Sequence, residues 1–475
     1  MTILKVILMY PNFKWLENWD SRTRWDLHPY NLCLLSAMID KKYDVKLIDA
    51  NMNDLTKEEF SEIIKTEKPD VVGISVLTDE YGECGLIAAE MIKRVDSNIK
   101  IVLGGVKAIS NPKSIVKNEN IDYVVVGEGE YIFKELCNYF NGEGEFPKRG
   151  VMYKKEGQII DTGKVEFIEN LDELPLPSYH KVDFNRYITQ PQRESIDRPR
   201  ELPYAHIITS RGCPYSCCFC TVGSISGKKS RCRSPENIIM EIEFLINNYG
   251  VKFLTFDDDN LLINKERAKK LFQLMIDKQF DLKWNVTSLA VYKLDEELID
   301  LMKRSGCQYV DIAIESGVER VLKEIIHKPL DLEYAKKIIK KLKEAEIDIA
   351  ANFVIGFPGE TWEEIRQTIK FAEDIDVDYV KIFVATPFRN TELYELAKKG
   401  GFLVEEFDVA NCIWSEASIK TDEFQPEDLK FLRAYEWDRI NFSTPEKRKK
   451  ISEMIGVTKE RLNEIRKSTL RKANS

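Results

Sequence analysis

The chain of 475 residues is too long for one ordinary domain, and its hydrophobic content of 43% is sufficient for packed cores. A net charge of −9 argues against nucleic-acid binding as the main task, and no apolar run approaches the roughly 18 residues of a membrane span. The ten cysteines fit reduced thiols, and the opening residues predict a first strand and not a signal peptide. We therefore expect a cytoplasmic protein of two or three domains, with no membrane span and no nucleic-acid partner.

The first 140 or so residues alternate apolar, β-branched runs with segments of helical periodicity. This alternation predicts a parallel, doubly wound, Rossmann-like sheet over residues 1–145, whose ligands bind beyond the carboxyl ends of the strands. The Pro- and acid-rich stretch Asn170–Tyr179 predicts a linker over residues 146–202. The expected strands are Val6–Tyr10, Val45–Asp49, Val71–Val76, Ile99–Leu103 and Tyr123–Val126, and the expected helices are Leu32–Lys41, Lys57–Thr66, Cys84–Val95, Ser114–Asn118 and Ile132–Asn141.

A second alternating series begins near Ala205. It holds six strand–helix units, fewer than the eight of a closed TIM barrel, so we expect an open, partial (β/α)6 TIM-type barrel over residues 203–400. Beyond it the pattern is helical and charged, which predicts a small C-terminal helical domain over residues 401–475. The stretch Pro445–Ser475 carries ten Lys and Arg against four Glu, which is typical of a solvated helical tail. The expected strands are His206–Ser210, Lys252–Asp257, Lys283–Val286, Tyr309–Ile314, Ile349–Ile355 and Val380–Ala385, and the expected helices are Pro235–Tyr249, Lys265–Lys278, Asp295–Arg304, Leu332–Ala345, Trp362–Asp374 and Thr391–Lys399.

Four of the ten cysteines are concentrated in one loop after the first strand of the second series. Cys213, Cys217 and Cys220 have the spacing C-x3-C-x2-C, which can hold three corners of a 4Fe–4S cubane. Such a cluster normally takes four ligands, so three local ligands imply an iron with an open site. Cys218 is expected to be a bystander. Cys232 as a fourth ligand would make a zinc site instead, but the chain has only four histidines and no second CxxC pair.

The CxxxCxxC loop resembles the signature of the radical S-adenosylmethionine (SAM) superfamily, and the first 400 or so residues are most similar to its cobalamin-binding, class B type members. The resemblance implies that the amine and carboxylate of SAM chelate the open iron, and that reductive cleavage gives methionine and a 5′-deoxyadenosyl radical. The matching segments outside the loop lie mainly at the ends of predicted strands, where a barrel presents its site. They are Arg231-x-Arg-Ser-Pro-Glu-Asn237, Phe256-Asp-Asp-Asp-Asn260, Ile314-Glu-Ser-Gly317 and Ile355-Gly-Phe-Pro-Gly-Glu360.

The same resemblance assigns a set of SAM contacts. Carboxylates after the second strand would meet the SAM amine, a sensible partner for a cation. A single carboxylate after a strand is often a helix N-cap. The evidence for a SAM site is therefore the joint occurrence of the motifs, and not any one residue. Ala290 stands where relatives often carry an Arg, which leaves the contact to the SAM carboxylate unassigned. The residues expected to contact SAM are Phe219, Asp257, Asp258, Asn260, Glu315, Ser316, Ile355 and Gly356.

The N-terminal motifs resemble those of cobalamin domains. Ser75-Val76-Leu77 ends the third strand and Gly104-Gly105 ends the fourth, and glycines there let a bulky ligand approach the backbone. Gly127-Glu-Gly-Glu130 then ends the fifth strand. Each motif alone is weak evidence for a cobalamin domain, and the three together in this order are stronger evidence. The residues expected to contact cobalamin are Tyr10, Pro11, Ser75, Leu77, Thr78, Gly104, Gly105, Gly127, Glu128, Gly129 and Glu130.

A lower axial ligand for cobalt is left open. Asp26-Leu-His28 matches the D-x-H of methionine-synthase-type domains, so His28 is a candidate cobalt ligand with Asp26 as its orienting partner. The following Pro29-Tyr30-Asn31 also resembles a Pro-rich helix start of the radical SAM branch, in which no histidine ligates. We favour the second interpretation, with His28 as an ordinary loop histidine.

The leading functional hypothesis is a cobalamin-dependent radical SAM methyltransferase that methylates an unactivated carbon of an unknown substrate. One alternative keeps both cofactors for cyclisation or rearrangement without methyl transfer. Another is a methylthiotransferase, which would need further cluster ligands from Cys33, Cys84 and Cys137, all in or beside helical patterns. The expected partners are a small-molecule or peptide substrate and an electron donor such as flavodoxin or ferredoxin.

Overall fold

The protein is described by a computed structural model that covers residues 3–16, 27–79, 81–164, 166–190, 194–405, 407–409 and 416–474. The chain divides into two compact units. The first comprises Met1–Tyr187 together with Ser224–Ser226, and the second comprises Ile188–Gly223 and Gly227–Ser475. None of the helices in the described ranges is long and apolar enough to cross a membrane.

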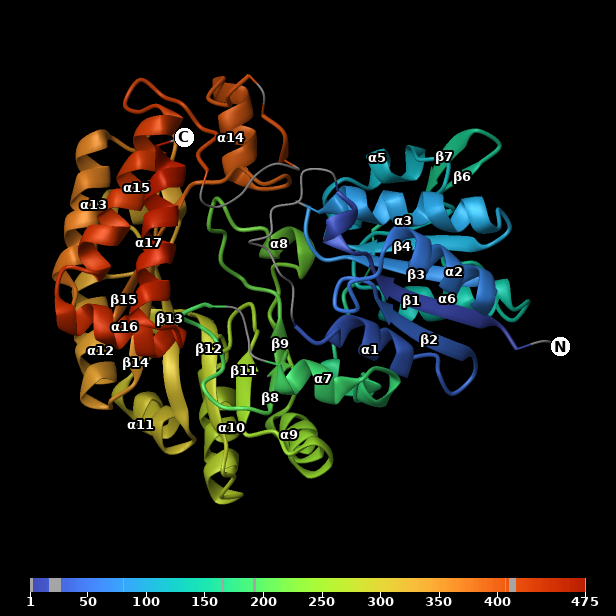
Figure 1. The fold of residues 1–475 in the computed structure, drawn as a ribbon, viewed down its shortest axis with the longest axis horizontal. Helices are drawn as coiled ribbons and strands as arrows, with labels where there is room; N and C mark the ends of the chain where they lie inside the picture. The colour runs from blue at the N-terminus through green and yellow to red at the C-terminus, as the bar shows by residue number, and fades with distance from the viewer. Residues whose placement is uncertain are drawn as a thin grey trace. The chain divides into compact units, whose positions relative to one another are not determined.

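The first unit is built on a seven-stranded sheet of order β2-β1-β3-β4-β5-β6-β7 (Figure 1). Its strands are β1 Lys5–Tyr10, β2 Asp44–Asp49, β3 Val71–Val76, β4 Lys100–Gly105, β5 Tyr123–Val125, β6 Val151–Lys155 and β7 Gln158–Asp161. Its helices are α1 Tyr30–Ala37, α2 Lys57–Glu67, α3 Gly82–Val95, α4 Val106–Ser110, α5 Pro112–Lys117, α6 Glu130–Phe140 and α7 Phe184–Thr189, with short 3-10 turns at Phe13–Trp15, Leu171–Glu173 and Tyr179–Lys181.

The order of the first five strands produces the doubly wound fold. They pair in parallel as β2-β1-β3-β4-β5, and the chain reverses its direction of travel between β1 and β3. An open α/β sheet binds its ligands at this point, outside the carboxyl ends of the strands. β6 and β7 add an antiparallel extension from within the stretch predicted as a linker. The expected Rossmann-like fold is confirmed.

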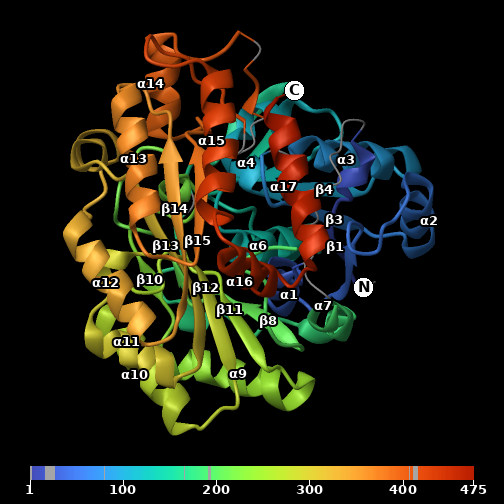
Figure 2. The same cartoon turned by 60° about the vertical axis from the view of Figure 1, so that its left-hand side comes forward.

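The second unit is built on a six-stranded parallel sheet of order β15-β14-β13-β12-β11-β8, with helices between successive strands (Figure 2). The strands are β8 Tyr204–Ile207, β11 Phe253–Phe256, β12 Lys283–Leu289, β13 Cys307–Glu315, β14 Asp348–Ile355 and β15 Tyr379–Val384, and a separate two-stranded ribbon joins β9 Ser210–Arg211 to β10 Arg231–Cys232. The helices are α8 Val222–Ile225, α9 Pro235–Tyr249, α10 Lys265–Asp277, α11 Glu296–Arg304, α12 Leu332–Glu344, α13 Trp362–Asp374, α14 Glu392–Gly400, α15 Pro426–Asn441, α16 Pro445–Ile455 and α17 Lys459–Ala473, with a 3-10 turn at Val291–Lys293 and a π-helix, η5, at Val321–Ile326.

The two faces of this sheet differ in chemistry. Phe256 and Trp284 pack against each other, and the Trp284 ring stacks on Phe272 of α10 at a centroid distance of 5.0 Å. Because side chains alternate along a strand, the neighbouring Thr255 and Asn285 point to the opposite, inner face. Both are almost fully buried and polar. The sheet is therefore an open, partial barrel with an apolar outer face and polar side chains inside, and the expected (β/α)6 fold is confirmed.

Helix α15 covers the outer strand of this sheet. Its last residue, Asn441, is buried and forms two backbone hydrogen bonds to Val380 of β15, accepting from its N–H at 2.8 Å and donating to its carbonyl at 2.9 Å. Leu429, near the start of the helix, packs against Gly356 at the end of β14. The amide of Asn441 thus takes the place of a neighbouring strand, and the C-terminal helices pack directly on the barrel.

Candidate functional site

The three motif cysteines lie on the loop that follows β9. Gly212 begins this loop with a φ of +82°, and the Cys213 N–H donates to the carbonyl of Gly227 at 3.2 Å. Cys213, Cys217 and Cys220 are each partly exposed. Burial raises the pKa of Cys217 and that of Cys220, the latter to about 11, and the neighbouring thiols raise both further. The three thiols thus lie on one short loop of eight residues, Cys213 to Cys220.

The two remaining cysteines of this region have other surroundings. Cys218 is 2% exposed, and its backbone N–H donates to the carbonyl of Ile326 at 3.0 Å. Its carbonyl accepts from Leu393. Cys232 lies in the β9–β10 ribbon, opposite Ser210. Within the described residues, no three His, Cys, Asp or Glu side chains converge on a site for a single metal ion.

Two buried arginines hold the base of the loop. Arg233 donates to the carbonyl of Ile208 at 3.1 Å and forms an ion pair with Glu241 of α9, which is fully buried. Arg267 of α10 donates to the carbonyls of Thr209 and Arg233 at 2.7 and 2.8 Å. The segment Arg231–Asn237 after the cysteines thus has a structural role in this fold, because it ties the chain between β8 and β9 to two helices.

The carboxylates after β11 divide into different roles. Asp258 is buried and accepts hydrogen bonds from the backbone and hydroxyl of Thr209 and from the hydroxyl of Ser210 at 2.5 to 3.1 Å. Asp259 accepts from the Gly212 N–H at 2.7 Å. Asp257 accepts from Thr287 and contacts His206 of β8, with 2.5 Å between its carboxylate and ring Nδ1. Asp258 and Asp259 therefore fix the cysteine loop.

Asn260 is the residue of this motif nearest to the thiols. Its amide nitrogen lies 3.9 Å from Sγ of Cys213, and its amide oxygen is buried without a hydrogen-bond partner in the described structure. The second carboxylate oxygen of Asp258 is likewise buried and unpartnered. A buried, unpartnered oxygen is an acceptor of the kind that an ammonium group pairs with. The contact of Asp258 and Asn260 with the SAM amine stays a prediction.

The Glu315-Ser316 motif ends β13. Glu315 has a φ of +72° and forms a 3.0 Å ion pair with Lys328, and both side chains are almost fully buried. Ser316 is completely buried and hydrogen-bonds to the hydroxyl of Thr368 at 3.0 Å and to the Val318 N–H. Of the two predicted residues, Ser316 has a structural role, because its hydroxyl bonds to Thr368 and to the backbone of Val318. Glu315 makes the ion pair.

The segment after β14 forms a tight turn around a buried carboxyl group. Gly356 has a φ of +90°, and a Cβ atom there would lie 2.4 Å from Leu429. Glu360 accepts from the N–H groups of Gly356 and Phe357 at 2.7 and 3.1 Å. The ring of Phe219, from the cysteine loop, lies 5.8 Å from that of Phe357. The predicted SAM contacts Phe219 and Ile355–Gly356 are thus brought to the same end of the barrel.

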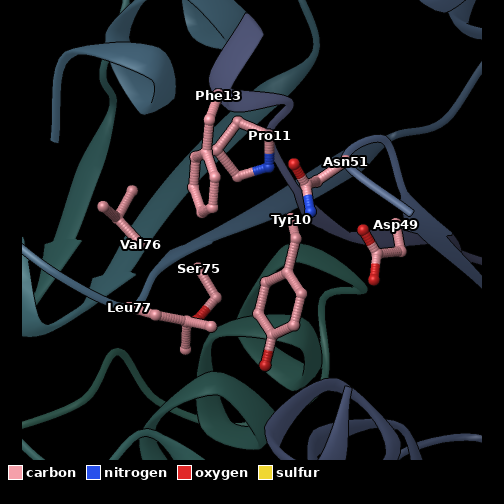
Figure 3. Close-up of a pocket in the computed structure, with 8 residues that line it drawn as sticks. All are labelled: Tyr10, Pro11, Phe13, Asp49, Asn51, Ser75, Val76 and Leu77. Atoms are coloured by element: carbon pink, nitrogen blue, oxygen red, sulfur yellow. The ribbon is translucent and has the colours of Figure 1, made fainter. Parts of the chain in front are cut away.

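In the first unit, a small pocket opens at the carboxyl ends of β1, β2 and β3 (Figure 3). This is where the order of strands reverses. Four predicted cobalamin contacts lie in its wall, and Asp49 and Asn51 of the β2 end were not predicted. Burial raises the pKa of Asp49 to about 6, and Tyr187 donates to its carboxylate at 3.0 Å. The pocket is lined by Tyr10, Pro11, Phe13, Asp49, Asn51, Ser75, Val76 and Leu77.

The glycine motifs stand beside this pocket in the sheet. Gly105 has a φ of +90°, and a Cβ there would lie 2.3 Å from the carbonyl oxygen of Val76. A Cβ at Gly104 would make an ordinary contact with Val125, at 3.9 Å. The hydroxyl of Thr78 is buried without a hydrogen-bond partner in the described part of the chain. A bare backbone and an unpartnered hydroxyl beside a pocket fit a large polar ligand such as cobalamin.

The Gly-Glu-Gly-Glu segment is partly structural. Gly127 has a φ of +125°, and the carboxylate of Glu128 accepts from the N–H of Ile168 at 2.7 Å. Gly129 is the N-cap of α6, and Glu130 lies buried in the first turn of that helix, where its charge suits the helix dipole.

His28 is packed among aromatic rings. It is 4% exposed, and its ring lies 5.1 Å from that of Phe184 and 5.7 Å from that of Tyr179. Asp26, its predicted orienting partner, lies outside the described residues. These surroundings are those of a core histidine. That His28 does not ligate cobalt, the interpretation favoured from the sequence, stays a prediction.

Several residues of the site were not predicted from the sequence. His206 contacts Asp257 and Lys328 pairs with Glu315, and neither His206 nor Lys328 is part of a motif. The inward position of His206 on its strand was a usable signal, whereas Lys328 follows a π-helix that the sequence pattern does not reveal. The three cysteines considered for a further cluster, Cys33, Cys84 and Cys137, are each fully buried in a helix.

A doubly wound unit with a pocket at its strand ends and a partial barrel with three thiols on one loop together define a B12-binding radical SAM enzyme. The sequence matches the Radical SAM superfamily over residues 207–372 and the B12 binding domain over residues 22–137. It is 34% identical to the uncharacterized methyltransferase PH0819 of Pyrococcus horikoshii, over 79% of this chain and 80% of that protein. The chain belongs to this family of radical SAM enzymes, which includes methyltransferases, and its cofactors are a 4Fe–4S cluster, SAM and cobalamin.

Two further proteins resemble the whole chain. The cytidylyl-2-hydroxyethylphosphonate methyltransferase of Streptomyces wedmorensis is 27% identical over 88% of each sequence. The cobalamin-dependent SAM radical enzyme OxsB, in a structure with aqua-cobalamin and SAM bound, superposes with a TM-score of 0.74. It is 14% identical and the match covers 98% of this chain and 72% of that one, which shows a shared fold.

Proposed function

We propose that this chain is a cobalamin-dependent radical SAM methyltransferase that transfers a methyl group to an unactivated carbon of a small molecule or peptide. The observation that carries the proposal is the pairing, in one chain, of a three-thiol loop with a strand-end pocket beside bare glycines. When bound, the cluster and SAM supply a 5′-deoxyadenosyl radical, and cobalamin supplies a transferable methyl group. The resemblance to methyltransferases over most of the chain supports the same conclusion.

Each residue of the predicted sites would have its own task once the cofactors are bound. Cys213, Cys217 and Cys220 would hold the cluster with three thiolates and leave one iron open to SAM. Asn260 and Asp258 would offer their unpartnered oxygens to the SAM amine. In the first unit, Ser75 and Thr78 would hydrogen-bond the cobalamin.

The proposal includes a partner and a location. A radical SAM cluster needs an electron from a low-potential donor, and we assign this to a flavodoxin or a ferredoxin. The nine described cysteines are free thiols, as expected in a reducing compartment such as the cytoplasm. The net charge of −9 supports a small-molecule or peptide substrate over nucleic acid.

A pair of neighbouring cysteines tests the cluster assignment. The variant Cys217→Ala is expected to lose the electron paramagnetic resonance (EPR) signal of the reduced 4Fe–4S cluster and the reductive cleavage of SAM. The variant Cys218→Ala removes a buried, hydrogen-bonded neighbour one position away and is expected to keep both. A full cluster signal in Cys217→Ala would contradict the assignment.

The products test the reaction class. Incubation with SAM and candidate substrates is expected to give a product heavier by one CH2 group, together with S-adenosylhomocysteine. A product of unchanged carbon count, with 5′-deoxyadenosine and methionine but no S-adenosylhomocysteine, would point instead to cyclisation or rearrangement.

A further inference from the structure

A buried ion pair lies beside the cysteine loop. Nζ of Lys328 is 3.0 Å from Oε1 of Glu315, and each residue is 7% exposed. Removing two charges from water costs several kcal/mol per ion, by general estimates, and their mutual attraction does not always offset it. A buried ion pair is therefore weak evidence for stability. The position of this one beside the cysteine loop points to a role in the chemistry of the site.

The backbone fixes both partners. Glu315 is the last residue of β13, in a left-handed conformation with a φ of +72°. Lys328 follows the π-helix η5 and the left-handed His327, and its N–H donates to the carbonyl of Leu322 at 2.8 Å. A non-glycine residue with positive φ is costly and persists where its surroundings require it. Both charges are thus held in place.

The pair is linked to the cysteine loop through the backbone. The carbonyl of Ile326, two residues before Lys328, accepts from the N–H of Cys218 at 3.0 Å. Cys218 directly follows Cys217, which we assign as a cluster ligand. The two buried charges therefore lie beside a segment that contacts the cysteine loop, where a medium of low dielectric screens them little.

We propose that the Lys328–Glu315 pair sets the reduction potential of the iron–sulfur cluster, with Lys328 favouring the reduced state and Glu315 opposing it. The inference rests on the proposed function, because it takes Cys217 as a ligand. One electron, from an external low-potential donor, adds one negative charge to the cluster. An ammonium group nearby in a medium of low dielectric stabilises that charge, and a carboxylate destabilises it.

Three variants of the full chain separate the two charges. After anaerobic reconstitution, the cluster is titrated with dithionite in the absence of SAM and its reduction is followed by EPR. Lys328→Gln is expected to shift the midpoint potential to more negative values, and Glu315→Gln to more positive values. The double variant Lys328→Gln/Glu315→Gln removes both charges, leaves none unpaired, and is expected to return toward the wild-type potential.

An exposed pair on the same helical segment provides the control. Lys323 and Glu319 are also 3.0 Å apart, but their side chains are 65% and 58% exposed, so water screens them. Lys323→Gln is expected to leave the potential unchanged. Unchanged potentials in both single variants, or an equal shift in Lys323→Gln, would overturn the inference.

Iron and sulfide content keeps the two proposals apart. Lys328 and Glu315 are not ligands, so all variants are expected to bind as much iron and sulfide as the wild type. A wild-type chain without a cluster would overturn the proposed function and this inference together. A chain that holds its cluster at a potential indifferent to both charges would overturn this inference alone.

Discussion

Two glutamates at the start of α13 experience opposite surroundings. Glu360 is completely buried, and burial raises its pKa to about 7, although two backbone N–H groups stabilise its charged form. Glu364, one turn further, forms a bidentate pair with Arg320 at 2.6 Å, which lowers its pKa to about 2. The same residue type thus acquires opposite proton affinities within a single turn, because one side chain faces the interior and the other faces a cation.

This difference predicts opposite effects of pH on two variants. The folded state binds the proton of Glu360 more tightly than the unfolded state, so the stability linked to it is present below about pH 4.5 and is lost as the pH rises through 7. Glu360→Gln removes this loss. Its melting temperature, relative to wild type, is therefore expected to rise by on the order of a few degrees from pH 5 to pH 8.

Glu364→Gln provides the matched comparison. The depressed pKa of Glu364 contributes stability above about pH 4.5 that is lost as the pH falls toward 2, so this variant is expected to be less stable than wild type at pH 8. Thermal unfolding followed by circular dichroism measures each difference, at pH 5 and pH 8 for Glu360→Gln and at pH 3 and pH 8 for Glu364→Gln. A parallel pH dependence of the two variants would contradict the assignment of their surroundings.

Single residues were predictable where a motif or a strand end marked them. The spacing of Cys213, Cys217 and Cys220 required no structure to suggest a cluster. The roles within the Asp257–Asn260 motif were not predictable, because Asp258 bonds to Thr209 and Ser210, which are 49 and 48 residues away in the chain. Sequence spacing identifies a group of carboxylates, but only the packing decides which of them remains available.

At the scale of elements, α15 links the C-terminal segment to the barrel. Asn441 satisfies both backbone groups of Val380 on the edge strand β15, and Leu429 fills the space above Gly356. An exposed edge strand is a site for unwanted pairing, and an amide side chain that imitates a strand removes it. The helix therefore stabilises the sheet. It also covers the turn at Gly356, which is a predicted SAM contact.

This arrangement predicts a large effect of one amide. Asn441→Ala leaves the N–H and carbonyl of Val380 buried and unpaired, at a cost of about 2 kcal/mol in the free energy of unfolding. Hydrogen exchange is expected to accelerate in β15 and α15 together. Asn248→Ala is the control, because Asn248 lies on α9 and makes one exposed side-chain hydrogen bond, so it is expected to change little. Equal effects of the two substitutions would contradict the role of Asn441.

The elements themselves followed the hydrophobic pattern closely, with two instructive exceptions. Strands such as Val71–Val76 are buried on both faces and appear as continuous apolar runs, which made them easy to predict. The pair β6 and β7 was missed because its outward residues, including Lys154 and Lys155, give no apolar run. The π-helix was missed because its single turn, Val321–Ile326, has no periodicity of its own.

At the scale of the whole molecule, each predicted cofactor site is contained in one unit. The pocket at the ends of β1, β2 and β3 is formed by residues of the first unit, and the cysteine loop with its supporting arginines belongs to the second. A site assembled within one compact unit depends on the packing of that unit. The binding of the two cofactors should therefore be separable by mutation, although methyl transfer needs both.

Two variants of the full chain, each expected to lose one cofactor and keep the other, test this separation. Ser75→Leu places a bulky apolar side chain in the pocket and is expected to abolish cobalamin binding while the reduced cluster keeps its EPR signal. Cys217→Ala is expected to do the reverse, with cobalamin retained in the protein fraction by its absorbance. Thr66→Leu, on the exposed face of α2, controls for added apolar volume and is expected to keep both cofactors. Both single-site variants are expected to lose methyl transfer completely, because the radical and the methyl group are needed in the same turnover. Loss of both cofactors in either variant would show that the two sites form as one structure and not as two.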